Sequence, residues 1–427
     1  MFKRLALLLS LIPAAAAAQT AVDGVWLLTE DVFGNPLHQR LTLKVDRTTL
    51  SGTLGSRPIE GSVDGNAIRF SSKSDDESDE FTGTISAGEI RGTLVHTTKD
   101  GPNPVKTSWS ARRVPAKRTG PPQRHEFVPT TFYRQFSAAN PPVLHIWPGD
   151  TVHTTTVDAG GADAKGVTQV LGGNPQTGPF YVETALPGDV LAVHLNRVRL
   201  NRDWAISDDG IVGRALNPEF AVKMKDGFKD VRWRLDRQRG VAAPEHATEH
   251  LANFTVPLRP MLGCVAVAPG FGSAPPPTGD SGRFGGNMDF NELVEGATVY
   301  LPVMQPGALL YIGDGHAAQG DGELNGNALE TSMEVEFTVD VLADKRLMTP
   351  RVESPTHIMS VGLGGNLEDA LRAATAGLSQ WLEQDYQLTP SEIAMVLGSS
   401  VEYAIAEVAD RNAGVAAKLR KDRLTFK

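Results

Sequence analysis

The chain is almost free of cysteine, because Cys264 is the only one among its 427 residues. A single thiol cannot form a disulfide within the chain, which excludes a disulfide-stabilised scaffold. Stability must then come from side-chain packing, a bound metal or oligomerisation. Cys264 lies in an apolar stretch, residues 260–269, so we expect a buried structural thiol rather than a nucleophile.

An excess of positive charge and a long apolar run are missing as well. The formal net charge is −9 at pH 7, which argues against nucleic acid and anionic membranes as partners, because both attract a basic face. Beyond the first residues no run of about 18 apolar residues occurs, so the sequence predicts no membrane span. The sequence also lacks Gly-x-Ser-x-Gly and His-Glu-x-x-His, the motifs of common serine hydrolases and helical zinc proteases.

The first 18 residues are typical of a secretory signal peptide. Lys3 and Arg4 form a basic start, residues 5–12 form an apolar core, and Ala16-x-Ala18 provides a small-residue cleavage site. We therefore expect cleavage after Ala18 and a periplasmic or secreted mature protein.

Residues 22–113 carry a repeated pattern that predicts a separate domain. Glycines followed by Ser or Thr and then an apolar residue occur as two pairs, with the members of each pair nine positions apart: Gly52, Gly61, Gly83 and Gly92. Short alternating strand patterns surround them, as in a small antiparallel meander or barrel. An acidic stretch, residues 71–80, is expected to be a solvated loop. Because this region has no cluster of catalytic residue types, we interpret it as an accessory domain.

The remainder is expected to be one larger domain, residues 131–427, behind a Pro-rich linker at 114–130. Dense strand patterns with Gly- and Pro-rich turns indicate a β-sandwich or barrel-like body. Residues 366–420 show helix start signals and are expected to be a helical C-terminal part, with its third helix over residues 401–409. The expected fold class is therefore mainly β with a C-terminal α addition.

Residues 285–330 contain the candidate site. An apolar, β-rich run leads into residues 313–323, GDGHAAQGDGE, in which an imidazole, three carboxylates and an amide are separated by glycine and alanine. Glycine permits the backbone angles that let polar side chains converge, and small neighbours leave room for a ligand. The pattern predicts a site for a metal or for a substrate of the size of a small amide.

Histidine and carboxylate side chains that follow predicted strands can meet at one edge of the body. The candidate ligands are His316, Asp314, Asp289 and Asp158. About three such ligands leave an open position for water on zinc or a similar ion, so a divalent metal, zinc in the first place, is the expected cofactor. Calcium is the alternative, although residues 321–332 match only the first half of an EF-hand loop.

Several stretches of the chain resemble the acetamidase/formamidase family. They are residues 285–289 (GGNMD), 300–309 (YLPVMQPGAL), 313–323 (GDGHAAQGDGE) and 174–183 (NPQTGPFYVE). The resemblance runs from about residue 141 to the C-terminus. It implies a β-rich body with a helical addition, and hydrolysis of a short linear amide to a carboxylate and ammonia. Two features depart from the family: the longer segment 196–255 and the signal peptide.

Amide hydrolysis requires a polarised carbonyl, an activated water and a proton for the departing ammonia. We expect a metal held by His316, together with Asp158 or Asp314, to meet the first two requirements. The expected partners are thus a small-molecule amide and, because disulfides are excluded, further copies of the same chain.

Four further residues complete the expected site. Glu183 or Glu323 is expected to carry the proton, because partial burial raises a carboxyl pKa toward neutrality. Asn287 and Gln319 are expected to hold the amide through hydrogen bonds. The alternative from a different class is a non-catalytic exported binding protein in which the same residues form a structural metal site.

Overall fold

The computed structural model describes residues 22–425 except residues 102, 116, 225–226 and 344. The predicted signal peptide lies outside the described residues. The chain divides into two compact units, residues 1–116 and residues 117–427. Each unit has its own apolar core, and each is described by itself below.

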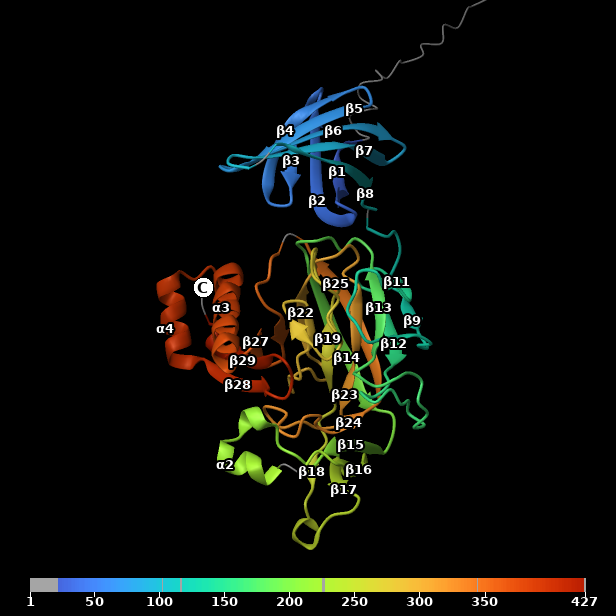
Figure 1. Cartoon of the computed structure of the whole chain (residues 1–427), viewed down its shortest axis with the longest axis vertical. Helices are drawn as coiled ribbons and strands as arrows, with labels where there is room; N and C mark the ends of the chain where they lie inside the picture. Colours follow the sequence, from blue (N-terminus) through green and yellow to red (C-terminus); the bar gives the residue numbers. More distant parts are fainter. Residues whose placement is uncertain (1–21, 102, 116, 225–226, 344, 426–427) are drawn as a thin grey trace, which may run out of the picture. The chain divides into compact units, whose positions relative to one another are not determined.

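The first unit is a closed barrel in which each strand pairs antiparallel with the next, and the last with the first (Figure 1). Its strands are β1 (Gly24–Val32), β2 (Asn35–Asp46), β3 (Thr49–Leu54), β4 (Arg57–Asp64), β5 (Ala67–Lys73), β6 (Glu77–Ser86), β7 (Glu89–Thr98) and β8 (Val105–Arg113). Alternate side chains such as Trp26, Leu28 and Trp109 fill the interior. The predicted small antiparallel β domain is confirmed.

The repeated glycines of the barrel occupy positions where two strands approach closely. A side chain at Gly61 would meet the backbone of Arg69 and Phe70, and one at Gly92 would meet the backbone of Thr82. Tight curvature of a small barrel brings backbones together in this way, and only glycine fits.

The prediction that residues 71–80 form a solvated loop is wrong for most of that stretch. Residues 71–73 belong to β5 and residues 77–80 to β6, so only the hairpin tip is a turn. Alternation within β6 turns Asp79 into the barrel, where it is 5% exposed and pairs with Arg57 and His96.

The second unit contains two sheets. In order across the first sheet lie β18 (Val256–Pro257), β17 (Val241–Pro244), β16 (Asp230–Asp236), β15 (Trp204–Asp208), β24 (Glu330–Thr331), β23 (Leu310–His316), β19 (Met261–Ala266), β21 (Gly285–Asn287) and β20 (Ser281–Gly282). Strand β13 (Gln176–Val182) also pairs with β23, and it carries β10 (Phe132–Tyr133) and β11 (Leu144–Ile146). The segment 196–255 extends this sheet through β15 to β17.

The second sheet packs on the first. Its order is β28 (Glu402–Glu407), β29 (Ala413–Arg420), β27 (His357–Gly364), β26 (Arg351–Glu353), β22 (Thr298–Pro302), β14 (Val190–Leu200), β25 (Met333–Leu342), β12 (Thr151–Thr155) and β9 (Arg124–Glu126). Val193 and Phe337 from this sheet share one buried core with Val265 and Ile312 from the other. The mainly β fold predicted from the sequence is confirmed.

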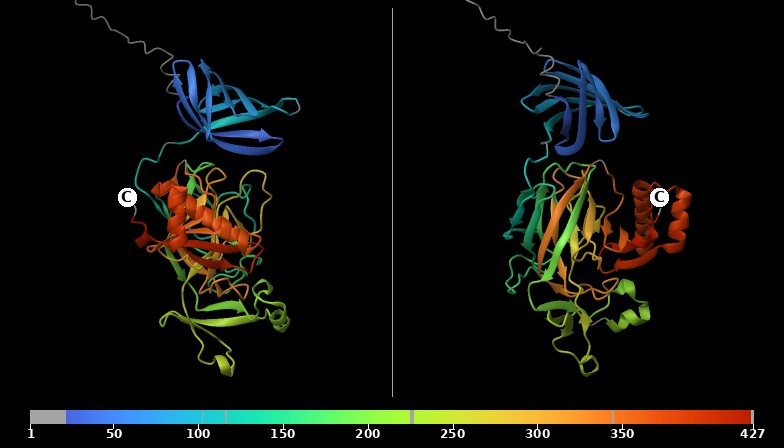
Figure 2. Two further views of the ribbon diagram at one scale, coloured as in Figure 1. Left: turned by 90° about the vertical axis from the view of Figure 1, so that its left-hand side faces the viewer. Right: turned by 180° about the vertical axis from the view of Figure 1, so that it is seen from behind.

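Two helices cover the end of the second sheet. Helix α3 (Leu367–Tyr386) begins at the N-cap Asn366, and α4 (Pro390–Ser400) begins with a capping box formed by Thr389 and Glu392. Figure 2 shows α3 lying across β27 and β29, and Ala374, Leu378 and other buried side chains join its core there. The remaining helical pieces are α2 (Pro218–Ala221) and short 3₁₀ turns at 213–215, 222–224, 249–251 and 421–423. No helix in the described part of the chain is long and apolar enough to cross a membrane.

Two predictions about the second unit are wrong in detail. Residues 401–409 are not a third helix: Glu402–Glu407 is strand β28, because pairing with β29 satisfies its backbone. The expected linker 114–130 contains strand β9, which adds to β12, and Arg124 forms an ion pair with Glu336. Both are cases in which pairing across the sheet outweighs a local sequence pattern.

Candidate metal and catalytic site

The candidate site forms where β23 ends. Asp314 and His316 are two residues apart on this strand and therefore point to the same face. Glu330 on β24 lies directly opposite His316, and Asp289 follows β21. Glu323 comes from the loop between β23 and β24. These five residues are at most 8% exposed.

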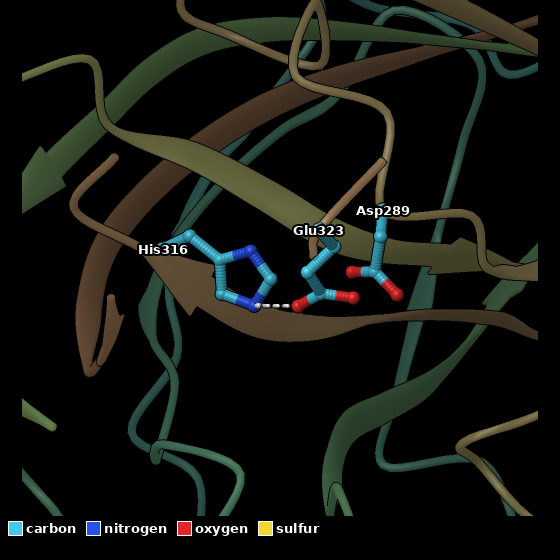
Figure 3. A group of neighbouring side chains, drawn as sticks. All are labelled: Asp289, His316 and Glu323. Carbon is cyan, nitrogen blue, oxygen red and sulfur yellow. Dashed lines mark ion pairs between the residues drawn. The ribbon is translucent and has the colours of Figure 1, made fainter. Parts of the chain in front are cut away.

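The imidazole is at the centre of the carboxylates. His316 Nε2 lies 3.2 Å from Glu330 Oε1, 3.5 Å from Asp314 Oδ1 and 4.0 Å from Glu323 Oε1. Figure 3 shows Glu323 between His316 and Asp289. Ligand atoms of two trios, Asp289–His316–Glu323 and Asp314–His316–Glu330, each lie within 4.8 Å of one another. Either trio has the composition of a site for a divalent metal.

Gln319 fixes the tautomer of the imidazole. Its amide nitrogen donates to the backbone carbonyls of Asp289 and Ala406, so its oxygen Oε1 must face His316 Nδ1, at 2.8 Å. Because that oxygen can only accept, Nδ1 carries a proton and Nε2 faces the carboxylates. Such a contact to the distal ring nitrogen orients a metal-ligating histidine.

A second group of amides holds the carboxylates in place. Asn287 Nδ2 donates to Asp289 Oδ2 and, at 2.7 Å, to Asp410 Oδ2, while its oxygen accepts from Asn174. Asn174, Gln319 and Asp410 are half-buried, so they form the rim between the buried carboxylates and solvent.

Several polar atoms of the site are buried and have no hydrogen-bond partner among the described residues: Asp289 Oδ1, Asp314 Oδ1, His316 Nε2 and Glu330 Oε2. Buried polar atoms are normally paired, since leaving one unpaired is costly. Four buried carboxylates beside a single imidazole also leave negative charge uncompensated. A divalent cation would bind the unpaired atoms and balance the negative charge, so these residues fit a metal.

The pKa values of the site show the same excess of negative charge. Burial, followed by the charges of Glu323 and Asp314, raises the pKa of Asp289 well above its ordinary value. Burial, followed by the charge of Asp314, raises the pKa of Glu330 to about 7. Burial would lower the pKa of His316, but the charges of Glu330 and Asp314 outweigh it and raise that pKa well above the ordinary value.

The local backbone is shaped around the carboxylates. Asp289, Asp314 and Glu323 have φ angles of 39°, 57° and 48°, in the left-handed region that non-glycine residues seldom adopt. Gly263 on β19 completes the arrangement, because a Cβ there would collide with the carboxylates of Asp314 and Asp289. Backbone strain of this kind concentrates at functional sites.

The structure brings together most of the predicted site residues, but two lie elsewhere. Asp158 pairs with the buried Arg202, at 2.7 Å between Oδ2 and Nη2, instead of facing His316. Glu183 pairs with His145 at 2.9 Å, and the His145 side chain is 59% exposed. Sequence order alone could not show which partners these two side chains would take.

The two predicted amide-binding residues have a different role in the structure. Asn287 and Gln319 donate their amide hydrogens to neighbouring groups of the protein. They position the carboxylates and the imidazole, and are not free to hold a substrate amide.

Sequence reasoning missed Glu330, Asp410, Glu407 and Asn174. Glu330 is identifiable only through its pairing with His316 across two strands. Glu407 is the last residue of β28 and Asp410 comes soon after it. The local sequence pattern predicted a helix for this segment, which hid their position. Burial and the nearby charge of Asp410 raise the pKa of Glu407 to about 8, and burial raises that of Asp410 to about 6.

Comparisons with known proteins give a consistent result. Residues 276–418 match the model of the acetamidase/formamidase family. The fold is similar to that of an acetamidase from Yersinia enterocolitica, with a TM-score of 0.62 and 29% identity, over 71% of this chain and 94% of the other. It is also similar to a protein of Thermoanaerobacter tengcongensis predicted to be an acetamidase/formamidase, with a TM-score of 0.61 and 26% identity, over 71% and 97% of the two chains.

A curated relative matches over a shorter stretch. The chain is 28% identical over 196 residues to a protein of Schizosaccharomyces pombe that is named as a putative formamidase. The alignment spans 35% of this chain and 47% of that protein, so the chain covers about half the length of this relative.

Proposed function

We propose that the protein hydrolyses the C–N bond of a short linear amide, giving a carboxylate and ammonia. The proposal starts from the match of residues 276–418 to the model of the acetamidase/formamidase family. The observation that carries the proposal is the buried group of Asp289, Asp314, His316, Glu323 and Glu330 within the matched residues. The acetamidase of Yersinia enterocolitica, with a similar fold, supports the same reaction class.

We propose that the group holds a divalent metal, with zinc as the first candidate. His316 Nε2 and two carboxylates of either trio would be its ligands. When bound, the metal supplies a Lewis acid for the amide oxygen and lowers the pKa of a water molecule toward neutrality.

The side chains of this chain have three tasks in the reaction. Gln319 holds His316 with Nε2 toward the carboxylates, and Asn287 holds Asp289 and Asp410. Since the two trios share only His316, the carboxylates outside the ligating trio remain beside it. One of them can take the proton of the attacking water and return it to the departing nitrogen. Burial of the group excludes bulk water and strengthens each of these electrostatic contacts.

The test is ammonia release from a panel of formamide, acetamide and longer linear amides, with metal analysis of the same sample. We expect turnover of at least one short amide, loss of turnover after chelation and recovery with zinc. The variant His316→Gln should lose both metal and turnover, whereas His145→Gln, at an exposed histidine, should keep both. A protein that binds metal but releases ammonia from none of these amides would be a binding protein with a structural metal site, contrary to the proposal.

We also propose that the mature protein is exported and forms homo-oligomers. The basic, apolar and small-residue pattern of the first 18 residues supports export, and the lack of a disulfide supports stabilisation by assembly. N-terminal sequencing of protein from the periplasmic fraction should begin at Gln19. Light scattering should give a mass that is a multiple of one chain, and a monomeric mass would contradict the second proposal.

A further inference from the structure

A small cavity lies between helix α3 and the second sheet, formed by residues outside the candidate metal site. Its volume is about 160 Å³, and among the residues that line it are Tyr300, Leu342, Leu347, Arg351 and Trp381. The cavity therefore has room for a ligand of a few non-hydrogen atoms.

Arg351 is the unusual member of the lining. It is 2% exposed, and its guanidinium lies 5.0 Å from the centre of the Trp381 ring. Its only hydrogen bonds to described residues go to two neutral amide oxygens, Gln380 Oε1 at 3.2 Å and Gln384 Oε1 at 2.9 Å. Its Nε is buried without a partner in the described part of the chain. A buried cation normally has a counter-charge.

The other charges around the cavity are already paired. Lys345 Nζ lies 2.7 Å from Asp385 Oδ1. Glu353 accepts from Tyr300 Oη at 2.7 Å and forms an ion pair with Lys421 at 2.6 Å. Arg351 is thus the one lining charge without an ion pair of its own among the residues that the structure describes; the acid whose charge acts on it, Asp385, is paired with Lys345. Burial lowers the pKa of Arg351 to about 10, so its guanidinium keeps its charge at neutral pH.

We propose that this cavity is a binding site for a short-chain carboxylate, with Arg351 as its anchor. A carboxylate supplies a direct ion-pair partner, for which the planar guanidinium is well shaped. Leu342, Leu347 and Trp381 offer an apolar wall for the alkyl part of such an anion. The proposal does not rest on the amidase function, because a carboxylate from any source has the same chemistry.

The experiment is calorimetric titration of the metal-loaded full-length mature protein with sodium acetate and sodium propionate, at constant ionic strength. Saturable binding is expected, at least about tenfold weaker in Arg351→Met because a charge-assisted contact is lost. Arg351→Lys should fall between the two, since it keeps the charge and loses the planar geometry. It also gives a result if the methionine variant fails to fold.

Two control variants separate this cavity from other anion sites. Arg372→Met removes an arginine on α3 whose side chain is 71% exposed, and it should bind acetate as the wild type does. Glu323→Gln alters the candidate metal site and should leave acetate binding at Arg351 unchanged. Unchanged acetate binding in Arg351→Met, or a loss confined to Glu323→Gln, would overturn the proposal. Equal binding of chloride or phosphate would overturn the assignment to a carboxylate.

Discussion

Three acidic residues of the candidate site hold uncommon backbone angles, and this limits what the surrounding residues can be. Asp289, Asp314 and Glu323 all have positive φ, at a cost of order 1–3 kcal/mol for each residue. Such conformations persist only where packing and hydrogen bonds enforce them. Gly263 is part of that enforcement, since it leaves the space in which Asp289 and Asp314 approach each other.

The variant Gly263→Ala tests this arrangement. Its added Cβ would push the carboxylates of Asp314 and Asp289 aside, so we expect at least about tenfold weaker metal binding and a similar loss of amide turnover. Metal affinity can be measured by competition with a chromophoric chelator. Gly279→Ala is the matched control, because nothing lies within 4 Å of a Cβ at that position. Equal metal affinity in both variants would contradict the prediction.

The pKa of Asp150, in the turn Pro148-Gly149-Asp150, predicts how the free energy of unfolding changes with pH. Burial alone would raise its pKa, but the backbone N–H groups of Gln123 and Trp147, together with His125 and Arg118, outweigh burial and lower the pKa. A lowered pKa in the folded state stabilises the protein above the unfolded value of 3.8, and this contribution disappears as the pH falls through the folded pKa.

Asp150→Asn should therefore reduce the free energy of unfolding at pH 7 by about 1–3 kcal/mol, the usual range for hydrogen bonds to a charged group. The difference from the wild type should shrink as the pH falls below about 4. Urea titrations at pH 7 and pH 3 measure both values. A difference that is as large at pH 3 as at pH 7 would show that the charge of Asp150 is not the cause.

At the scale of elements, helix α3 packs so closely on β27 at Gly362 that no side chain fits at that position. A Cβ at Gly362 would meet the backbone of Ala370 and Ala374 in α3. This close contact, together with the Asn366 cap, fixes the helix above the sheet. It also defines one wall of the cavity that contains Arg351.

Gly362→Ala should consequently destabilise the second unit by about 1–3 kcal/mol, as overpacking of a dense core does. Gly365→Ala, just beyond the end of β27, meets nothing within 4 Å and should change stability far less. The midpoints of urea unfolding provide the comparison. Similar midpoints for the two variants would mean that α3 shifts without cost.

On the scale of the whole molecule, the barrel and the larger unit have separate apolar cores. The candidate metal ligands all belong to the larger unit. Two cores of this kind are expected to unfold as two cooperative transitions.

Metal removal should then act on one transition alone. A ligand that binds only the folded state stabilises the unit that binds it, so chelation should lower the melting temperature of the larger unit and leave that of the barrel unchanged. Differential scanning calorimetry with and without chelator measures this. A chelator that shifts both transitions, or neither, would contradict a metal held by the larger unit alone.

The sequence by itself determined what depends on local chemistry and spacing. Alternating apolar residues predicted the β-rich body, spaced glycines predicted the small barrel, and the capped starts at Asn366 and Thr389 predicted two helices. Within the candidate site it identified the residues near one strand end, Asp314, His316 and Glu323, because neighbours in sequence share a location.

Only the tertiary structure decided which distant residues join them. Glu330 reaches His316 through a pairing between strands, and Asp410 reaches Asn287 from beyond β28, a segment whose own pattern favours a helix. Asp158 and Glu183 have suitable chemistry and strand-end positions, yet their side chains pair with Arg202 and His145. Contacts of this kind arise from the order and register of strands in a sheet, which no local pattern records.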